Sequence, residues 1–227
     1  MIRKKFNEDY FEKIDTEDKA YFLGLIYADG CIINDLNNHR YKLCIKLHNK
    51  DKHILEEFIK FVNGEMKLWF HGQREMCEVN LSGKKIINDL ENKGVYPKKT
   101  FTIKYPDIDE KLERHFLRGY FDGDGCVRVN TDKRDGNKRG DLRIVGGSMD
   151  MLNKINERMN KLFNTSINKL YGPKDKDYGF IGWAGMADIE KIYNGFYNET
   201  DLFLTRKKII FDSVINEIKN KTKYRKK

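Results

Sequence analysis

The chain has 227 residues, 39% of them hydrophobic, so it can bury one or two real cores and is not a disordered chain. It carries 44 Lys and Arg against 35 Asp and Glu, and the formal net charge of +9 favours an anionic partner. The four cysteines form no CxxC pair, which argues against a structural zinc site and suits a reducing, intracellular setting. The N-terminus lacks an apolar signal core and no run approaches transmembrane length, so we expect neither secretion nor a membrane partner.

One stretch of the chain occurs twice. Residues 22–30 read FLGLIYADG, and residues 116–125 read FLRGYFDGDG. Both copies have an apolar run with a glycine, a small residue four positions later, and then Asp-Gly. The equivalent acids, Asp29 and Asp124, are 95 positions apart (124 − 29). A period of this length indicates two copies of one structural unit.

Both copies are predicted to be helices that end at Gly30 and Gly125, which fit the left-handed position just past a helix end. Each helix has two small residues four positions apart on one face, which allows two backbones to approach closely. These residues are Gly24, Ala28, Gly119 and Gly123. An acid in the last turn opposes the helix dipole, and two such acids in a close helix pair bring two anions together. A bound cation would relieve this repulsion.

The same order of elements is expected after each copy: two strands, a helix, two strands and a helix. In the first repeat we predict strands at 31–33, 40–48, 66–71 and 75–81, and helices at 50–63 and 84–93. In the second we predict strands at 127–129, 142–145, 166–171 and 178–183, and helices at 149–163, 187–193 and 205–220. The pattern predicts an α+β fold in which each repeat has a four-stranded antiparallel sheet with helices on one face. The predicted division is a first repeat at 1–96, a connector at 97–107 and a second repeat at 108–227.

The polar faces of the expected strands are basic. In residues 40–48 one face is polar and the other apolar, because the side chains alternate. An ordinary solvated face would alternate in the same way, but four basic or imidazole side chains among the five on the polar face favour a surface that follows phosphates. A two-stranded ribbon also fits the DNA major groove. The candidate DNA-binding residues are Arg40, Lys42, Lys46, His48, Lys67, Arg74, Arg128, Lys133, Arg134, Lys138, Arg139 and Arg143. Loops at 34–39, 72–74, 131–141 and 172–177 are expected at the hairpin tips.

The doubled motif at this spacing resembles the LAGLIDADG homing endonucleases in their single-chain, two-motif form, and the resemblance covers nearly the whole chain. It implies two pseudo-twofold-related repeats that join through the motif helices and form a curved saddle on double-stranded DNA. It further implies a site-specific endonuclease that makes a double-strand break in a long pseudo-palindromic target by metal-dependent phosphodiester hydrolysis.

The resemblance also implies roles for individual residues. Asp29 and Asp124 would be the catalytic acids and would bind Mg²⁺ or Mn²⁺, with Ca²⁺ expected to allow binding without cleavage. The adjacent Gly30 and Gly125 are included in the expected metal site. Tyr27 departs from the family, which often has an acid there, whereas the second copy keeps Asp122 at that position.

In the family a basic residue follows the last helix of each repeat. Here the equivalents are Lys99 and Lys207, and a slip of one position to Lys98, Arg206 or Lys208 stays open. Lysines beside the acids would stabilise charge on a phosphate or influence the attacking water.

Two other classes of function stay open from sequence. One is an RNA maturase that assists splicing, for which the partner is intron RNA; the other is a catalytically silent DNA-binding module, which the two intact motif acids disfavour. Binding to host intron RNA, compared with binding to the intron-less DNA site, distinguishes the first from a nuclease. Two motifs in one chain predict a monomer. We expect it in the cytoplasm with the nucleoid, or in an organelle or nucleus, depending on the host.

Overall fold

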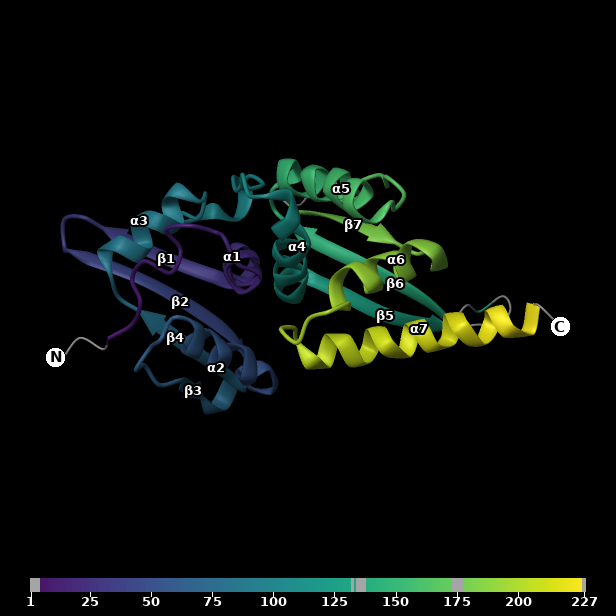
Figure 1. Ribbon diagram of the computed structural model, residues 1–227, viewed down its shortest axis with the longest axis horizontal. Helices are drawn as coiled ribbons and strands as arrows, with labels where there is room; N and C mark the ends of the chain where they lie inside the picture. Colours follow the sequence, from purple (N-terminus) through teal and green to yellow (C-terminus); the bar gives the residue numbers. More distant parts are fainter. Residues whose placement is uncertain (1–4, 132, 134–137, 173–177, 226–227) are drawn as a thin grey trace.

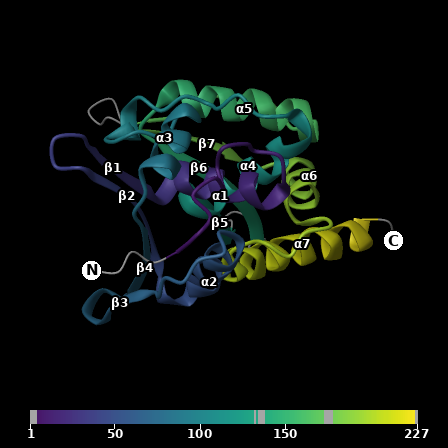
Figure 2. The same ribbon diagram turned by 60° about the vertical axis from the view of Figure 1, so that its left-hand side comes forward.

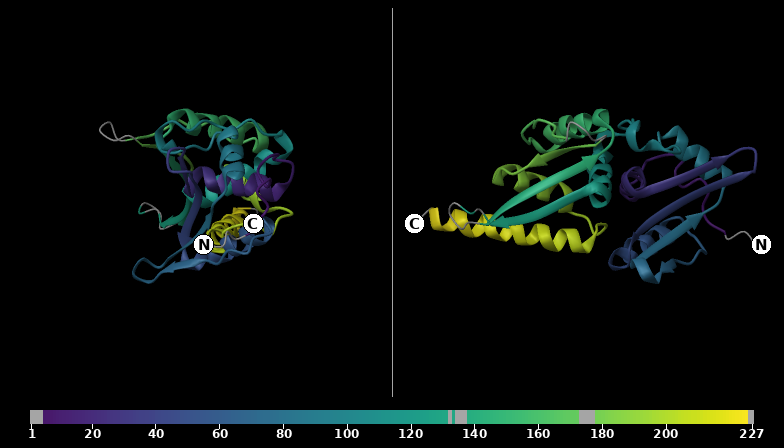
Figure 3. Two further views of the ribbon diagram at one scale, coloured as in Figure 1. Left: turned by 90° about the vertical axis from the view of Figure 1, so that its left-hand side faces the viewer. Right: turned by 180° about the vertical axis from the view of Figure 1, so that it is seen from behind.

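The computed structural model describes residues 5–131, 133, 138–172 and 178–225 of the chain. Its centre is a pair of helices, α1 (Glu17–Asp29) and α4 (Glu110–Asp124), with one sheet on either side (Figure 1). These helices are the two motif stretches. Seen from behind, the long strand pairs β1–β2 and β5–β6 flank the central helices (Figure 3). The α+β fold with a central motif-helix pair is therefore confirmed.

The two motif helices touch through their small residues. A Cβ added to Gly24 would lie 2.0 Å from the carbonyl oxygen of Phe116, and one added to Gly119 would lie 2.0 Å from that of Tyr21. These separations are far below van der Waals contact, so the backbones pack directly against each other. The close approach that the small-residue spacing predicts is confirmed.

The glycines after the motif helices are needed for a different reason from the predicted one. Gly30 and Gly125 have φ of −77° and −83°, so the prediction that they adopt the left-handed conformation is wrong. Each begins a strand in extended conformation. A Cβ on Gly30 would lie 2.6 Å from the carbonyl oxygen of Ile26, and one on Gly125 would lie 2.4 Å from that of Phe121. Glycine thus lets the chain leave the helix directly into a strand.

The first sheet has four antiparallel strands in the order β1-β2-β4-β3. The strands are β1 (Gly30–Asp35), β2 (Arg40–His48), β3 (Trp69–His71) and β4 (Met76–Leu81). Helix α2 (Lys52–Phe61) follows β2, and helix α3 (Lys84–Asn92) follows β4. In β2 the predicted apolar face is buried, and the predicted polar face points away from it. The strand expected at 66–71 is shorter, because only its last three residues pair with β4.

The second sheet has three strands in the part of the chain that the structure describes, in the order β5-β6-β7. They are β5 (Gly125–Thr131), β6 (Lys138–Gly146) and β7 (Gly179–Trp183), and they pack on α5 (Met149–Phe163), α6 (Met186–Tyr197) and α7 (Thr205–Arg225). The prediction of a fourth strand at 166–171 is wrong, since only Tyr171 bridges to β7. The side chain of Asn156 bonds the backbone N–H and C=O of Asn168 instead, so these groups are not free for a sheet ladder.

The segments that carry the candidate lysines lie in corresponding places. Lys99 begins the short 3-10 helix η3 (Lys99–Phe101) in the connector, and Lys207 lies in the first turn of α7. The connector therefore supplies the counterpart of the start of α7. In a turned view, the loop between β1 and β2 extends well beyond the helices (Figure 2). The repeat boundaries at 96–97 and 107–108 stay a prediction.

Candidate active site

The two motif acids come together at the ends of the central helices. Asp29 is the last residue of α1 and Asp124 the last residue of α4, so the close packing of the helices brings their ends together. A Cβ added to Gly123 would lie 2.2 Å from the Cβ of Ala28 and 3.2 Å from Oδ2 of Asp29. The Asp29 carboxylate therefore lies against the second helix one residue before Asp124. Small residues at both positions permit this arrangement.

The pKa values of both acids are raised, because the packed helix ends keep part of the water away from them, although Asp29 is exposed at the surface and Asp124 is half-buried. Burial, and next the negative charge of Asp29, raise the pKa of Asp124 from 3.8 to about 6. Burial also raises the pKa of Asp29, while the charges of Lys207 and Lys99 act in the opposite direction. A hydrogen bond with Tyr120 favours the ionised form of Asp124 and lowers its pKa. Burial is thus the main cause, and the second carboxylate adds to it at Asp124.

Each candidate lysine caps the end of the motif helix in its own repeat. The Lys207 ammonium donates to the carbonyl oxygens of Phe121, Asp122, Gly123 and Gly125 at 2.8, 2.5, 3.1 and 2.6 Å. The Lys99 ammonium donates to the carbonyl oxygen of Gly30 at 2.5 Å. Burial lowers the pKa of both lysines. Positive charge at a helix C-terminus offsets the dipole there, so the lysines stabilise the helix ends that hold the acids.

Asp122 and Tyr27 connect each motif helix to its lysine-bearing segment. Oδ2 of Asp122 accepts hydrogen bonds from the backbone N–H of Leu204 and the hydroxyl of Tyr21, both at 2.8 Å. At the equivalent position in α1, the Tyr27 hydroxyl donates to the carbonyl oxygen of Lys93, ahead of the connector. Tyr27 therefore takes over the connecting role of Asp122, which gives a physical account of its departure from the motif.

The donor atoms fit a divalent cation with oxygen ligands. Within the described residues no group of three or more His, Cys, Asp and Glu could hold a metal ion. The site offers two carboxylates, and Mg²⁺ commonly binds through one or two carboxylates and keeps several waters. The carbonyl oxygens of Gly30 and Gly125 accept hydrogen bonds from the lysines, and a second lone pair remains on each. Metal binding by Gly30 and Gly125 stays a prediction.

The basic residues of the first sheet lie where the alternation places them, but several are paired with acids. Lys46 contacts Glu78 at 2.8 Å, and His48 contacts Glu75 at 3.3 Å. Glu78 also contacts His71 at 3.0 Å, and the alternation of β4 could have identified this acid on the polar face. Exposed candidates are Arg40, Lys67 and Arg74, whereas Lys42 is half-buried.

The second sheet shows the same mixture of charges. Arg143 pairs with Asp141, with 2.8 Å between Nη2 and Oδ2, and its guanidinium lies over the Phe180 ring at 5.0 Å. Arg128 donates to the Cys126 sulfur at 3.3 Å. Arg128, Lys133 and Arg139 are exposed. Lys138 is in β6, but its side chain is not described, and Arg134 and most of the expected loop at 172–177 lie outside the described residues.

A pocket adjoins Asp124 on the side of Lys99. It has a volume of about 380 Å³ and lies between η3 and the end of β6. Its lining includes Asp124, Lys99, Phe101, Tyr120, Gly146 and Gly147. The pocket thus opens beside Asp124 on the Lys99 side of the site. No helix in the described residues combines the length and the apolar character needed to cross a bilayer.

Comparisons with known proteins agree with this fold. Residues 111–192 match the family model of the LAGLIDADG-like domain. The I-LtrWI LAGLIDADG homing endonuclease bound to target DNA superposes with a TM-score of 0.58 at 18% identity, over 95% of this chain and 98% of that one. I-SmaMI, bound to uncleaved DNA with calcium ions present, gives a TM-score of 0.62 at 13% identity, over 89% and 92% of the two chains.

Two curated relatives match at the sequence level. The intron-encoded DNA endonuclease ai2b of Dictyostelium discoideum is 25% identical over 171 residues, which are 70% of this chain and 65% of that protein. A probable translation initiation factor IF-2 of Methanocaldococcus jannaschii is 26% identical over 195 residues, which are 80% of this chain but 15% of the factor. Residues 111–192 thus match the LAGLIDADG-like domain, and the chain has the fold of the LAGLIDADG homing endonucleases, in agreement with the resemblance that the doubled motif indicates.

Proposed function

We propose that this protein is a site-specific DNA endonuclease that makes a double-strand break in a long, pseudo-palindromic target. The observation that carries the proposal is the pair of acids, Asp29 and Asp124, with raised pKa values, at the ends of two helices in direct backbone contact. Neighbouring carboxylates with raised pKa values are typical of functional sites. The DNA-bound LAGLIDADG endonucleases of the same fold, and the intron-encoded endonuclease relative, support the same function.

The carboxylates of Asp29 and Asp124 would hold divalent cations, Mg²⁺ or Mn²⁺. When bound, such a cation supplies an activated water and neutralises charge on the phosphate. Lys207 and Lys99 hold the helix ends and keep positive charge next to the acids. The sheets would follow the two halves of the target through their outward basic side chains. We further propose a monomer, located wherever its target DNA lies.

The test of this function begins with target selection. Purified protein is incubated with a randomised duplex library and Mg²⁺, and cut molecules are recovered by adaptor ligation and sequenced. One long enriched motif with a break on both strands is the expected result. No enrichment together with selective binding of intron RNA would favour the maturase, and selective DNA binding without cutting would favour a silent binding module.

DNA binding is expected to be strongly salt dependent. If the two sheets neutralise about six to ten phosphates, affinity should fall about 10³–10⁵-fold between about 50 and 200 mM salt. Lys42→Gln on the DNA-facing side of β2 should reduce the salt slope by about one. The control is Lys60→Gln on α2, where Lys60 is exposed and pairs with Glu57 at 2.7 Å. Fluorescence anisotropy at a series of salt concentrations measures the affinity of each variant. A nearly flat salt response of the wild type would contradict a saddle-shaped DNA-binding surface.

The two half-sites are expected to differ in sequence. The polar face of β2 carries Lys42 and Lys46, whereas β6 carries Arg143 and then ends at Gly146. Because the two repeats have diverged, they need not read identical half-sites. Perfect palindromes built from each half-site should be cut more slowly than the natural target. Equal cleavage of both palindromes and the natural target would show that the repeats read alike.

A further inference from the structure

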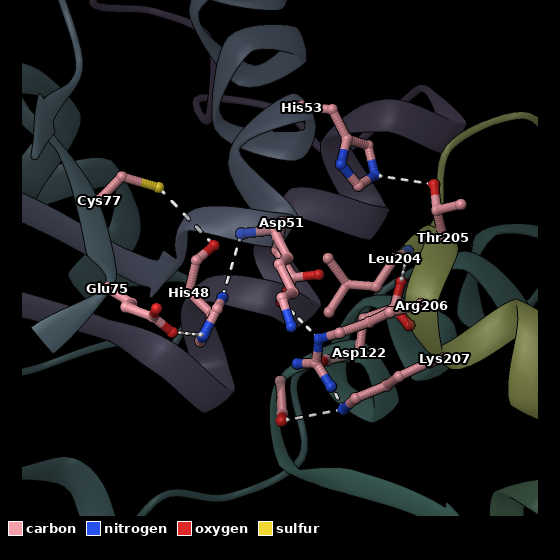
Figure 4. Close-up of polar contacts among 12 residues, drawn as sticks. His48, Asp51, His53, Glu75, Cys77, Asp122, Leu204, Thr205, Arg206 and Lys207 are labelled. Carbon is pink, nitrogen blue, oxygen red and sulfur yellow. Dashed lines mark hydrogen bonds and ion pairs between the residues drawn. The ribbon is translucent and has the colours of Figure 1, made fainter.

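The start of α7 is held by the other repeat. Nε of Arg206 donates to Oδ2 of Asp51 at 2.7 Å, and Asp51 lies just after β2 of the first repeat. The Asp51 side chain is 1% exposed and that of Arg206 is 47% exposed. Figure 4 shows Arg206 of α7 beside Asp51, with Lys207 next to Arg206. A buried carboxylate with one charged partner keeps that partner in place, because losing it would leave a buried charge uncompensated.

A second residue of the first repeat supports the same contact. Nε2 of His53 lies 3.2 Å from the carbonyl oxygen of Phe203 and 3.2 Å from Oγ1 of Thr205. The backbone that enters α7 is therefore fixed on both sides of Leu204, whose N–H bonds Asp122. The next residue after Arg206 is Lys207, which caps the end of α4 around Asp124.

On the Lys99 side of the site, the contact that corresponds to Asp51–Arg206 is a hydrogen bond between uncharged groups. Ser148, at the start of α5 in the second repeat, donates to the carbonyl oxygen of Ile103 at 2.6 Å, just after η3 and Lys99. Lys99 bonds one carbonyl oxygen, whereas Lys207 bonds four. The 380 Å³ pocket also adjoins the Lys99 side. The two sides are thus related by the repeat but differ in charge, in the number of hydrogen bonds and in packing.

We propose that Asp51 and Arg206 are a positioning pair that holds the Lys207 side of the active site from the other repeat, so that the two DNA strands are cut at unequal rates. This inference rests on the proposed endonuclease function. The pair acts through the backbone at the start of α7 and through Lys207 on the end of α4. The Ser148 contact is the weaker counterpart for the Lys99 side. Neither Asp51 nor Arg206 needs to touch the reacting atoms.

The test measures each strand separately. The selected target duplex carries a different fluorophore at each 5′ end, and single-turnover rate constants are obtained for both strands. Asp51→Asn and Arg206→Gln are expected to slow the same strand, by about tenfold to a hundredfold, because small displacements cost this much in positioned reactions. The double variant should be no slower than the slower single variant, since the residues act as a pair. Ser148→Ala should slow the other strand.

A control distinguishes positioning from general stability. Glu157→Gln removes the exposed contact of Lys154 with Glu157 on α5, at 2.9 Å, and should change neither strand. Hydrogen exchange in Asp51→Asn should increase at the first amides of α7 and not in α5. Equal slowing of both strands, unchanged strand rates, or opposite preferences of Asp51→Asn and Arg206→Gln would overturn the proposal.

The failure of the proposed function looks different from the failure of this inference. If the wild type cuts neither strand of any selected duplex, the endonuclease function fails, and the unequal strand rates fail with it. If the wild type cuts both strands and the exchange of α7 amides is unchanged in Asp51→Asn, only the positioning pair is overturned.

Discussion

Asp29→Asn and Asp124→Asn are each expected to abolish double-strand cleavage and to leave DNA binding largely intact. Loss of one carboxylate removes a ligand for the cation and should lower the rate about 10³-fold or more. The basic faces of the sheets are unchanged in these variants, so affinity for the target in Ca²⁺ should stay near that of the wild type. Gel-based cleavage and anisotropy on the same duplex measure the two properties. Weak binding of both variants would indicate a structural role for the acids.

The same variants should be at least as stable as the wild type without metal. The pKa of Asp124 is 3.8 in an ordinary setting and about 6 in the folded chain. Between these values the folded state binds more protons than the unfolded state, so stability falls as pH rises through about 6. Asn cannot ionise, so Asp124→Asn should exceed the wild type by about 0.5–2 kcal/mol at neutral pH. In melts in EDTA, this gain should disappear near pH 4. If Asp124→Asn is less stable than the wild type at neutral pH, the ionised Asp124 carboxylate does not destabilise the folded state and this argument is wrong.

Gly119→Ala is expected to be strongly destabilising, although it adds only one methyl group. Its Cβ would lie 2.0 Å from the carbonyl oxygen of Tyr21, so the helices must separate. Overpacking of this kind costs about 1–3 kcal/mol and more where backbone atoms must move. Separation would also displace Asp29 from Asp124, so cleavage should fall with stability. Urea denaturation and cleavage rates measure both effects.

Gly72→Ala provides the matched control for this substitution. Nothing lies within 4 Å of a Cβ at Gly72, and its φ is not in the left-handed region, so alanine should be neutral or slightly stabilising. If Gly119→Ala is as stable as Gly72→Ala, the helices are not in direct backbone contact and the account of the interface fails.

Local patterns were sufficient to predict much of the fold. The strand at 40–48 and the helix at 149–163 have the predicted bounds, because alternation and helical spacing are unbroken over their full length. The face of Gly24 and Gly119 could be predicted from spacing alone. The strand expected at 166–171 of the second sheet could not be excluded from sequence, because the side-chain amide of Asn156 bonds the backbone at Asn168 and replaces a strand pairing. A side chain that competes with a sheet ladder leaves no periodic signal.

In the site, too, the residues within a local motif could be predicted, whereas contacts between distant parts of the chain could not. The motif identifies Asp29 and Asp124, and their proximity follows from the helix pair. The partners of Arg206 and of Lys46 could not be predicted, since Asp51 and Glu78 reach them through the tertiary fold. The left-handed prediction for Gly30 failed because helix ends followed by glycine usually continue into a turn, whereas here a strand starts at once.

The most direct test of the central claim is anomalous diffraction from Mn²⁺ in crystals of the protein with its selected duplex. Crystals are grown in Ca²⁺ with uncleaved DNA and then soaked in Mn²⁺. Anomalous peaks are expected within bonding distance of the Asp29 and Asp124 carboxylates and of DNA phosphate oxygens at the two cleavage positions. Anomalous peaks located elsewhere, or no peak at these carboxylates with DNA bound in the saddle, would contradict the assignment of the acids as the metal-binding centre.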